Sequence, residues 1–305
     1  MDAPFIKGQS VPIKNCWHFS TDGNSVDVLF YGDDDFIAAM NRIYVVVGVY
    51  KVVILAFSLM DTHVHFVLYG EFDECNRFMH EYVRRTSIHL ARIQGRHNSL
   101  KDVPIHHQAV DNDLYLKTVI CYVVKNAPVG GISYNAVDYP WSSGPLYFRS
   151  EGNWASPRWT VENLRLSDTL SARQRRQVFG LRESIYSSSV KMIGRLIFPG
   201  EYVAYELVEA IYRTHKGYNY FLCRSKEEDV ESRGGFVSRL SIPIQEMRVI
   251  KKQVCKELFG QDNTKNLNTG QRLRLARTLK SRYNSSPKQI AKLSGLIYEE
   301  VKNLL

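Results

Sequence analysis

The chain has 305 residues, 44% of them hydrophobic, and a net charge of +9. A chain of this length buries one sizeable core and leaves room for further folded units. Its five cysteines contain no C-x-x-C pair and are odd in number, so neither a disulfide framework nor a zinc knuckle is expected. The pattern of a signal peptide is absent, and Lys51 interrupts the apolar run at 44–59 below membrane-spanning length. We therefore expect a soluble, cytoplasmic protein with no membrane partner.

A strand-rich run is predicted from residue 45 to residue 68, which is dense in Val, Ile, Leu, Phe and Tyr. It contains His63 and His65, and a strand places residues i and i+2 on one face. Two imidazoles side by side on a strand are half of a metal site. The alternative is that each ring is neutral, donates one N–H to a carbonyl and packs in the core. The pair alone leaves both interpretations open.

Residues 72–94 follow with the periodicity of a long helix that covers a sheet. Its inward positions are predicted to be Phe78, Met79, Tyr82, Val83 and Leu90. Arg84 and Arg85 fall on the outward side, where they can track a DNA backbone or remain solvated. Further along, His106 and His107 are adjacent, so on a strand they point to opposite faces and cannot form a metal-binding pair.

A second helix is predicted between residues 112 and 128, because apolar residues recur there with helical spacing and a proline ends the pattern. Tyr122 and Asn126 are four residues apart, so a phenol and a side-chain amide project from one face. Tyr122 can instead be a core tyrosine, and Asn126 can simply satisfy loose carbonyls at the helix end. Tyr115, two turns earlier on the same face, is the rival to Tyr122, but no Asn follows it at the fourth position.

Several segments, in this order, resemble the single-tyrosine HUH transposases and, among them, the REP-associated tyrosine transposases. The likeness covers residues 13–150, and its segments are CWHFS at 16–20, VLFYGDDDF at 28–36, AFSLMDTHVHF at 56–66, YVVKNAPV at 122–129 and DYPWSS at 138–143. The resemblance implies an α+β fold in which a ferredoxin-like antiparallel sheet carries the histidines on a central strand and is covered by helices. A mostly helical C-terminal region follows this domain.

The resemblance also implies the chemistry of the site. His63, His65 and, as third ligand, Asn126 would hold a divalent metal, Mg²⁺ or Mn²⁺, that polarises a phosphodiester. Tyr122 would be the nucleophile, which forms a covalent 5′-phosphotyrosine and releases a 3′ hydroxyl that can later rejoin the DNA. The expected partner is single-stranded, hairpin-bearing DNA, and relatives act as monomers or as homodimers.

Two departures from the family pattern keep other functions open. Ala127 stands between Asn126 and Pro128, where many relatives have Asn followed directly by Pro, and residues 105–110 lack the basic strand that relatives often carry. Both favour a noncatalytic DNA-binding protein that retains the fold. A third hypothesis is a metal phosphoesterase that uses the histidine pair for hydrolysis, but Asp61 alone supplies an acidic group beside the pair. Asp61 can orient an imidazole or merely shape a turn.

Positive charge is concentrated in the second half of the chain, because residues 1–150 have a net charge of −2 and residues 151–305 one of +11. We expect a catalytic domain at 1–150, a mixed, partly helical connecting region at 151–235 and a helical domain at 236–305. The candidate DNA-binding residues of this helical domain are Arg272, Arg274, Arg277, Lys280, Arg282 and Lys288.

Four helices are expected from residue 244 onward, joined by short polar turns. The last two, at 287–305, have the pattern of a helix-turn-helix with Gly295 at the turn. Glu299 and Glu300 near the start of the second helix are unfavourable for a helix that enters a DNA groove. A small module for protein contact is therefore the alternative to a DNA-binding domain.

Overall fold

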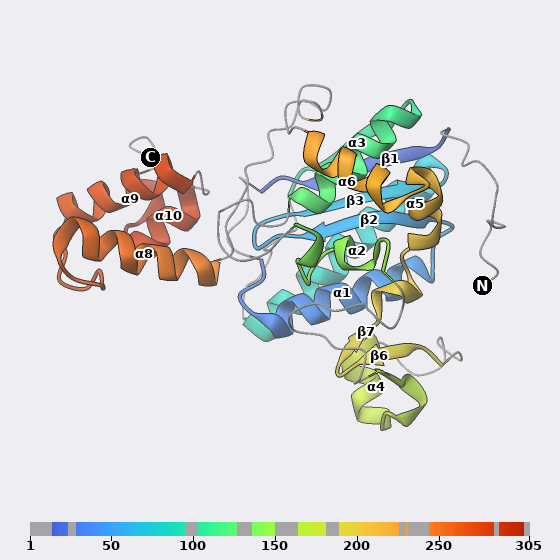
Figure 1. The fold of residues 1–305 in the computed structure, drawn as a ribbon. Helices are drawn as coiled ribbons and strands as arrows, with labels where there is room; N and C mark the ends of the chain where they lie inside the picture. Colours follow the sequence, from blue (N-terminus) through green and yellow to red (C-terminus); the bar gives the residue numbers. More distant parts are fainter. Residues whose placement is uncertain are drawn as a thin grey trace.

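The computed structural model describes residues 14–23, 29–94, 103–126, 136–149, 164–180, 189–225, 230, 244–283 and 287–301. A four-stranded antiparallel sheet with the strand order β2-β3-β1-β4 forms its centre (Figure 1). The strands are β1 Cys16–Thr21, β2 Val53–Leu59, β3 Val64–Tyr69 and β4 Ile105–Val110. Together with the helices, this sheet makes the chain an α+β protein, as the sequence predicts.

Helices cover both faces of the sheet. They are α1 Asp33–Val47 and α2 Phe72–Gln94, which pack against each other, and α3 Asp113–Lys125. The ring of Phe66 on β3 contacts Tyr82 of α2 with a centroid distance of 5.1 Å. The ring of the preceding residue, His65, contacts Tyr122 of α3 at 5.7 Å. Because successive strand residues point to opposite faces, α2 and α3 lie on opposite sides of the sheet.

The predicted covering helix at 72–94 is confirmed with the same bounds. Its predicted inward side chains are all buried against the sheet, and these are Phe78, Met79, Tyr82, Val83 and Leu90. The apolar face repeats every three or four residues, and its burial is what holds the helix on the sheet.

The strand-rich run predicted at 45–68 is partly wrong. Residues Val45 to Val47 form the last turn of α1, whereas β2 and β3 occupy Val53–Leu59 and Val64–Tyr69. Three β-branched residues in a row favour a strand locally. However, the buried side chains of α1 before them have helical spacing, and the helix continues through these valines and ends at Gly48.

The region after residue 150 adds further elements to this domain. A second, three-stranded sheet is formed by β5 Leu164–Leu166, β6 Lys191–Ile193 and β7 Leu196–Ile197. The helices of this region are α4 Ala172–Phe179, α5 Tyr205–Tyr212 and α6 His215–Arg224. Short 3-10 helices are η1 Ala136–Asp138, η2 Gly144–Leu146, η5 Ser167–Thr169 and η7 Pro199–Glu201. Gly180, with φ of 68°, ends α4.

The expected connecting region shares the core of the first domain wherever the structure describes it. The side chain of Asn41 on α1 accepts from the Ile197 N–H and donates to the Arg195 carbonyl, both at 2.8 Å. The Ala204 N–H donates to the Ile54 carbonyl of β2 at 2.9 Å. One hydrophobic cluster therefore includes buried residues of β1 to α3 and of β6 to α6.

The tail has a hydrophobic cluster of its own. Its helices are α8 Ile244–Phe259, α9 Thr269–Tyr283, α10 Pro287–Ser294 and α11 Tyr298–Val301, close to the predicted positions. Figure 1 shows α8, α9 and α10 as a group beside the sheet domain. Gly295, with φ of 70°, lies in the turn between α10 and α11, where the sequence predicts a turn. In the parts of the chain that the structure describes, no helix is both long and apolar enough to span a membrane.

Candidate metal and tyrosine site

The two predicted histidines lie side by side where the β2–β3 hairpin turns. The Met60 N–H donates to the His63 carbonyl at 2.8 Å, which closes the turn just before β3 begins at Val64. The rings of His63 and His65 have a centroid distance of 5.0 Å. Both side chains are almost completely buried, with 3% and 1% of their surface exposed. His65 is on β3, whereas His63 lies in the turn just before it, so the hairpin and not a single strand brings the two rings together.

His63 has one ring nitrogen engaged and one available. Its Nδ1 lies 2.9 Å from the Thr62 hydroxyl, whereas its Nε2 is buried and has no hydrogen-bond partner among the described residues. Burial lowers the pKa of His63 to about 4, although the nearby carboxylate of Asp22 acts in the opposite direction. The ring is therefore neutral at physiological pH, which is the form that binds a metal ion.

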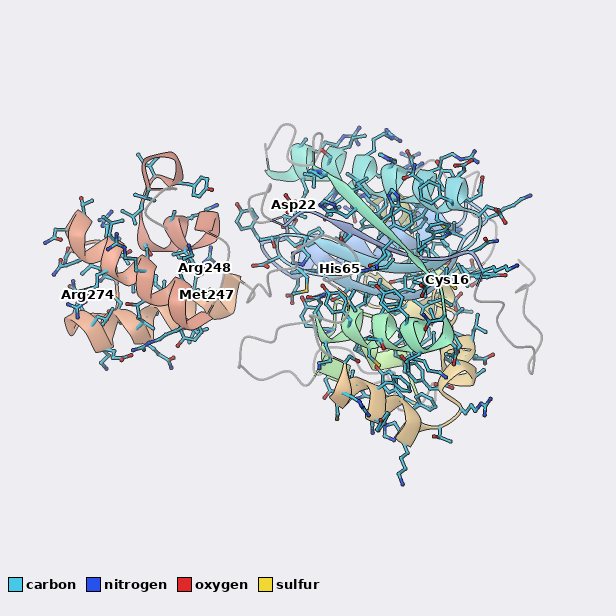
Figure 2. All side chains as sticks on the ribbon, turned by 90° about the horizontal axis from the view of Figure 1, so that it is seen from above. Cys16, Asp22, His65, Met247, Arg248 and Arg274 are labelled. Carbon is cyan, nitrogen blue, oxygen red and sulfur yellow. The ribbon has the colours of Figure 1, made fainter. Side chains whose placement is uncertain are left out.

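His65 is held at both ring nitrogens. Its Nδ1 lies 3.1 Å from Nε2 of His18, and its Nε2 lies 3.4 Å from Nδ2 of Asn126. Burial, followed by the neighbouring His63 and His18, keeps the pKa of His65 well below its ordinary value. Figure 2 shows His65 between Cys16 and Asp22, which mark the two ends of β1. The strand register agrees, because His65 is paired with Ser20 of β1.

Helix α3 brings the predicted tyrosine and amide to the histidines. The Asn112 side chain caps its start by accepting from the Tyr115 N–H at 2.8 Å. Asn126 is the C-cap residue, and its backbone N–H donates to the Tyr122 carbonyl at 2.9 Å. The Asn126 backbone thus lies at the end of the helix, while its side chain reaches His65. A position at the helix end is therefore compatible with a role of the Asn126 side chain beside the histidines.

Tyr122 is the tyrosine of α3 that packs against the histidine rings. Its ring centroid lies 5.7 Å from that of His65 and 5.7 Å from that of His18, and both contacts are edge-on. The side chain is 2% exposed. Four residues that the sequence predicts as one site, His63, His65, Tyr122 and Asn126, are therefore gathered in one place, but the phenol is enclosed.

His18 is a residue of this site that the sequence analysis did not single out. It lies on β1, is fully buried, and its ring is nearly parallel to that of His65, with a centroid distance of 5.3 Å. Burial lowers its pKa to about 3. The feature of the sequence that could have pointed to His18 is a histidine inside the apolar strand segment CWHFS. Its partner could not be identified from the sequence, because the pairing of β1 with β3 joins residues that are far apart in the chain.

The donor set fits a divalent cation with mixed nitrogen and oxygen ligands. No group of three or more His, Cys, Asp or Glu side chains that could hold a metal ion occurs among the described residues. The third ligand would instead be an amide, and a rotation of the Asn126 side chain can place Oδ1 where Nδ2 now lies. With the buried Nε2 atoms of His63 and His65, this makes three neutral donors on two rigid elements.

Asp61 and the adjacent histidines of β4 are the remaining residues that the sequence names near the site. Asp61 is buried in the turn before the histidines, and its backbone carbonyl accepts from the N–H groups of Leu29 and Phe30. His107 contacts Phe72 of α2 at a centroid distance of 4.9 Å. The β1–β4 register aligns His106 with Ser20, on the opposite face. The adjacent histidines of β4 thus face opposite ways, as predicted.

The structure gives the candidate DNA-binding arginines different surroundings. Arg84 and Arg85 both bind Glu81, at 2.7 Å and 2.6 Å. Arg282 binds Glu257 through two hydrogen bonds of 2.9 Å and 3.0 Å. These ion pairs lie on the protein surface, where such pairs are weak, so a DNA phosphate can still compete with the glutamates for the arginines.

Within α9, one arginine is structural and its neighbours are exposed. Arg272 donates to the carbonyls of Leu267 and Gly295, both at 2.9 Å, and so ties α9 to the turn of the helix-turn-helix. Arg274 and Arg277 are exposed, and Lys280 is half-buried. Lys288 lies on α10, but its side chain is outside the described part of the structure.

A comparison with models of known protein families matched none of them. Comparisons with curated proteins and with solved structures returned no match either. What supports a function is therefore the set of motifs in the sequence and the geometry into which the chain folds them.

Proposed function

We propose that the protein is a DNA strand transferase of the single-tyrosine HUH type. The observation that carries this proposal is the convergence of His63, His65 and Asn126 beside Tyr122, from a hairpin and from a helix far along the chain. The element order β-α-β-β-α-β and the strand order β2-β3-β1-β4 also correspond to a ferredoxin-like sheet, which the family resemblance implies.

The proposed reaction uses Tyr122 as the nucleophile on a phosphodiester of single-stranded DNA. The phenol loses its proton, its oxygen forms a bond to phosphorus, and the bond from phosphorus to the 3′ oxygen breaks. The products are a 5′-phosphotyrosine on the protein and a DNA strand with a free 3′ hydroxyl. Attack by a 3′ hydroxyl on the phosphotyrosine reverses these steps and rejoins DNA without hydrolysis of a nucleotide.

Three side chains would supply the ligands of the metal that this chemistry requires. His63 and His65, through Nε2, and Asn126, through Oδ1, would hold Mg²⁺ or Mn²⁺. The bound cation would stabilise the charge that develops on the phosphate oxygens. Two imidazoles in the ligand set favour Mn²⁺ over Mg²⁺ at equal concentration.

The burial of Tyr122 sets a condition on this proposal. With 2% of its side chain exposed, the phenol meets DNA only if the end of α3 moves or its surroundings open. The basic tail supplies the attraction for the DNA strand, because phosphate neutralisation is independent of sequence. Hairpin-bearing single-stranded DNA is the proposed substrate, in the cytoplasm, with the protein acting as a monomer or a homodimer.

The test is the formation of a covalent adduct. The full chain would be incubated with Mn²⁺ or Mg²⁺ and labelled hairpin-bearing single strands, followed by denaturing electrophoresis. Tyr122→Phe should abolish the adduct, while Tyr115→Phe, a matched change on the same helix, should keep it. Free cleavage products with no attached protein would indicate a hydrolase instead.

A noncatalytic DNA-binding protein that retains the fold is the second candidate. The enclosed phenol of Tyr122 and the exposed Arg274 and Arg277 of the tail favour it. It predicts salt-sensitive DNA binding by the full chain and no adduct with either metal, whatever hairpin is offered.

A further inference from the structure

On the sheet, His65 has another histidine, His18, as a polar neighbour. Nε2 of His18 lies 3.1 Å from Nδ1 of His65, and the two rings are nearly parallel, with an angle of 17° between their planes. Both side chains are at most 1% exposed. Two strands of one sheet hold them, since β1 and β3 are paired through this region. This distance is that of a hydrogen bond in a fixed geometry.

One proton must lie between these two nitrogens, and its position decides what His65 can do. If Nδ1 of His65 carries the proton, it donates to His18, and Nε2 of His65 keeps a lone pair directed toward Asn126. If Nε2 of His18 carries the proton, a neutral His65 is protonated on its own Nε2 and cannot bind a metal there. The proton in the contact between the two rings therefore decides whether His65 can bind a metal through Nε2 or is only a core histidine.

The contact with Asn126 favours the first arrangement. The amide Nδ2 of Asn126 can only donate a hydrogen bond, so Nε2 of His65, 3.4 Å away, is the acceptor and carries the lone pair. A neutral His65 with its lone pair on Nε2 is protonated on Nδ1, which lies 3.1 Å from Nε2 of His18. Nε2 of His18 is then the acceptor in this contact.

We propose that His18 is a positioning residue that accepts the Nδ1–H of His65 and so keeps the lone pair of His65 Nε2 directed at Asn126. Its consequence for metal binding rests on the proposed function, but the position of the proton does not. A partner of this kind fixes the orientation of a ligating histidine, and its loss typically lowers metal affinity roughly 10- to 100-fold.

The first experiment locates the proton in the full chain without any metal. Nitrogen-15 long-range correlation spectra distinguish the two neutral forms of each histidine, and His65 is assigned from a His65→Gln sample. We expect His65 to be protonated on Nδ1 and His18 to be protonated on Nδ1 as well. A His65 protonated on Nε2 in the unsubstituted protein would overturn the proposal. This readout is independent of whether the protein cleaves DNA.

The second experiment titrates Mn²⁺ into variants and follows it by electron paramagnetic resonance. His18→Gln keeps an acceptor and should retain affinity within a few-fold, whereas His18→Phe should lose roughly 10- to 100-fold. Phe19→Leu is the control, because this buried neighbour on β1 points to the other face and contacts Phe72. It can destabilise the fold but should leave Mn²⁺ affinity unchanged.

The outcomes separate this inference from the proposed function. Equal Mn²⁺ affinities for His18→Phe and the unsubstituted protein would overturn the positioning role. If no protein binds Mn²⁺ but His65 is protonated on Nδ1 only when His18 is present, the positioning role stands and the metal-dependent function is rejected. Adduct formation that survives His18→Gln and not His18→Phe supports both.

Discussion

Asn126 and His65 are 61 positions apart in the sequence, and folding brings Nδ2 of the first to 3.4 Å from Nε2 of the second. Asn126 ends α3, and His65 is the second residue of β3, so this contact joins the helix to the sheet. Tyr122, one turn earlier on α3, packs its ring against the same histidine. The position of the helix end therefore determines both the third ligand and the nucleophile of the proposed site.

Asn126→Ala should weaken Mn²⁺ binding, because it removes the only ligand proposed from α3. We expect a loss of roughly 10-fold or more by isothermal titration, since a ligand is removed outright. Asn126→Asp keeps an oxygen at the same place and adds charge, and it should bind Mn²⁺ at least as tightly as the unsubstituted protein. Similar affinities for the Ala and Asp variants would show that Asn126 is a structural helix end and no ligand.

Stability should fall as the solution is acidified below the ordinary pKa of histidine. Burial lowers the pKa of His18 to about 3 and of His63 to about 4, and the pKa of His65 also lies well below its usual value. An unfolded histidine takes up its proton near pH 6.5, so below roughly that pH the unfolded chain binds protons that the folded chain does not. The contribution of these neutral histidines to the free energy of unfolding is therefore fully present above roughly pH 6.5 and declines as the pH falls toward about 4.

Urea unfolding measured between about pH 7.5 and about pH 4.5 checks this. Each such histidine contributes up to about 1.4 kcal/mol per pH unit to the slope below roughly pH 6.5. His18→Gln, which cannot titrate, should reduce the slope by one such contribution. An unfolding free energy that does not change with pH in this range would contradict the burial of neutral rings.

Gly23→Ala should displace His63. A Cβ built at Gly23 would lie 2.8 Å from Nδ1 of His63 and 3.2 Å from the Thr62 hydroxyl, and both of these side chains are buried. We expect a loss of roughly 1–3 kcal/mol in unfolding free energy and weaker Mn²⁺ binding. Gly270→Ala is the control, because its nearest contact would be at an ordinary 3.5 Å. Equal metal affinity in both variants would exclude Gly23 from shaping the site.

Arg272→Ala should loosen the helix-turn-helix, whereas Arg274→Ala should not. Arg272 donates to the Gly295 carbonyl at the turn and to the Leu267 carbonyl before α9, and loss of such charged donors costs about 1–3 kcal/mol. Hydrogen exchange of peptides that cover α10 and α11, followed by mass spectrometry, should show faster exchange for Arg272→Ala alone. Identical exchange in the two variants would argue against this structural role.

The exposed arginines of α9 should carry DNA affinity. Replacement of Arg274 and Arg277 by alanine should weaken binding of single-stranded DNA and reduce the salt dependence of the binding constant by about 0.7 per lost phosphate contact. Arg282→Ala is the comparison, because its guanidinium already binds Glu257 and should contribute less. Fluorescence anisotropy over a range of salt concentrations measures both effects. An unchanged salt dependence in the double variant would favour a protein-contact role for the tail.

Local patterns in the sequence predict the helices and the two halves of the site. The spacing of apolar residues predicts α2 and the tail helices close to their observed bounds, because a helix is defined by contacts three and four residues apart. The i and i+2 spacing of His63 and His65, and the i and i+4 spacing of Tyr122 and Asn126, likewise depend only on local geometry.

Contacts between distant segments are decided by the tertiary structure. The β1–β3 register that sets His18 against His65, the packing of residues 190–225 onto α1 and β2, and the binding of Arg272 to the Gly295 carbonyl all join residues far apart in the chain. No spacing rule encodes such pairs, because the burial of a shared core selects the register and orientation of each element. Val45 to Val47 illustrate the same effect, since they are β-branched and yet complete a helix whose apolar face is already buried.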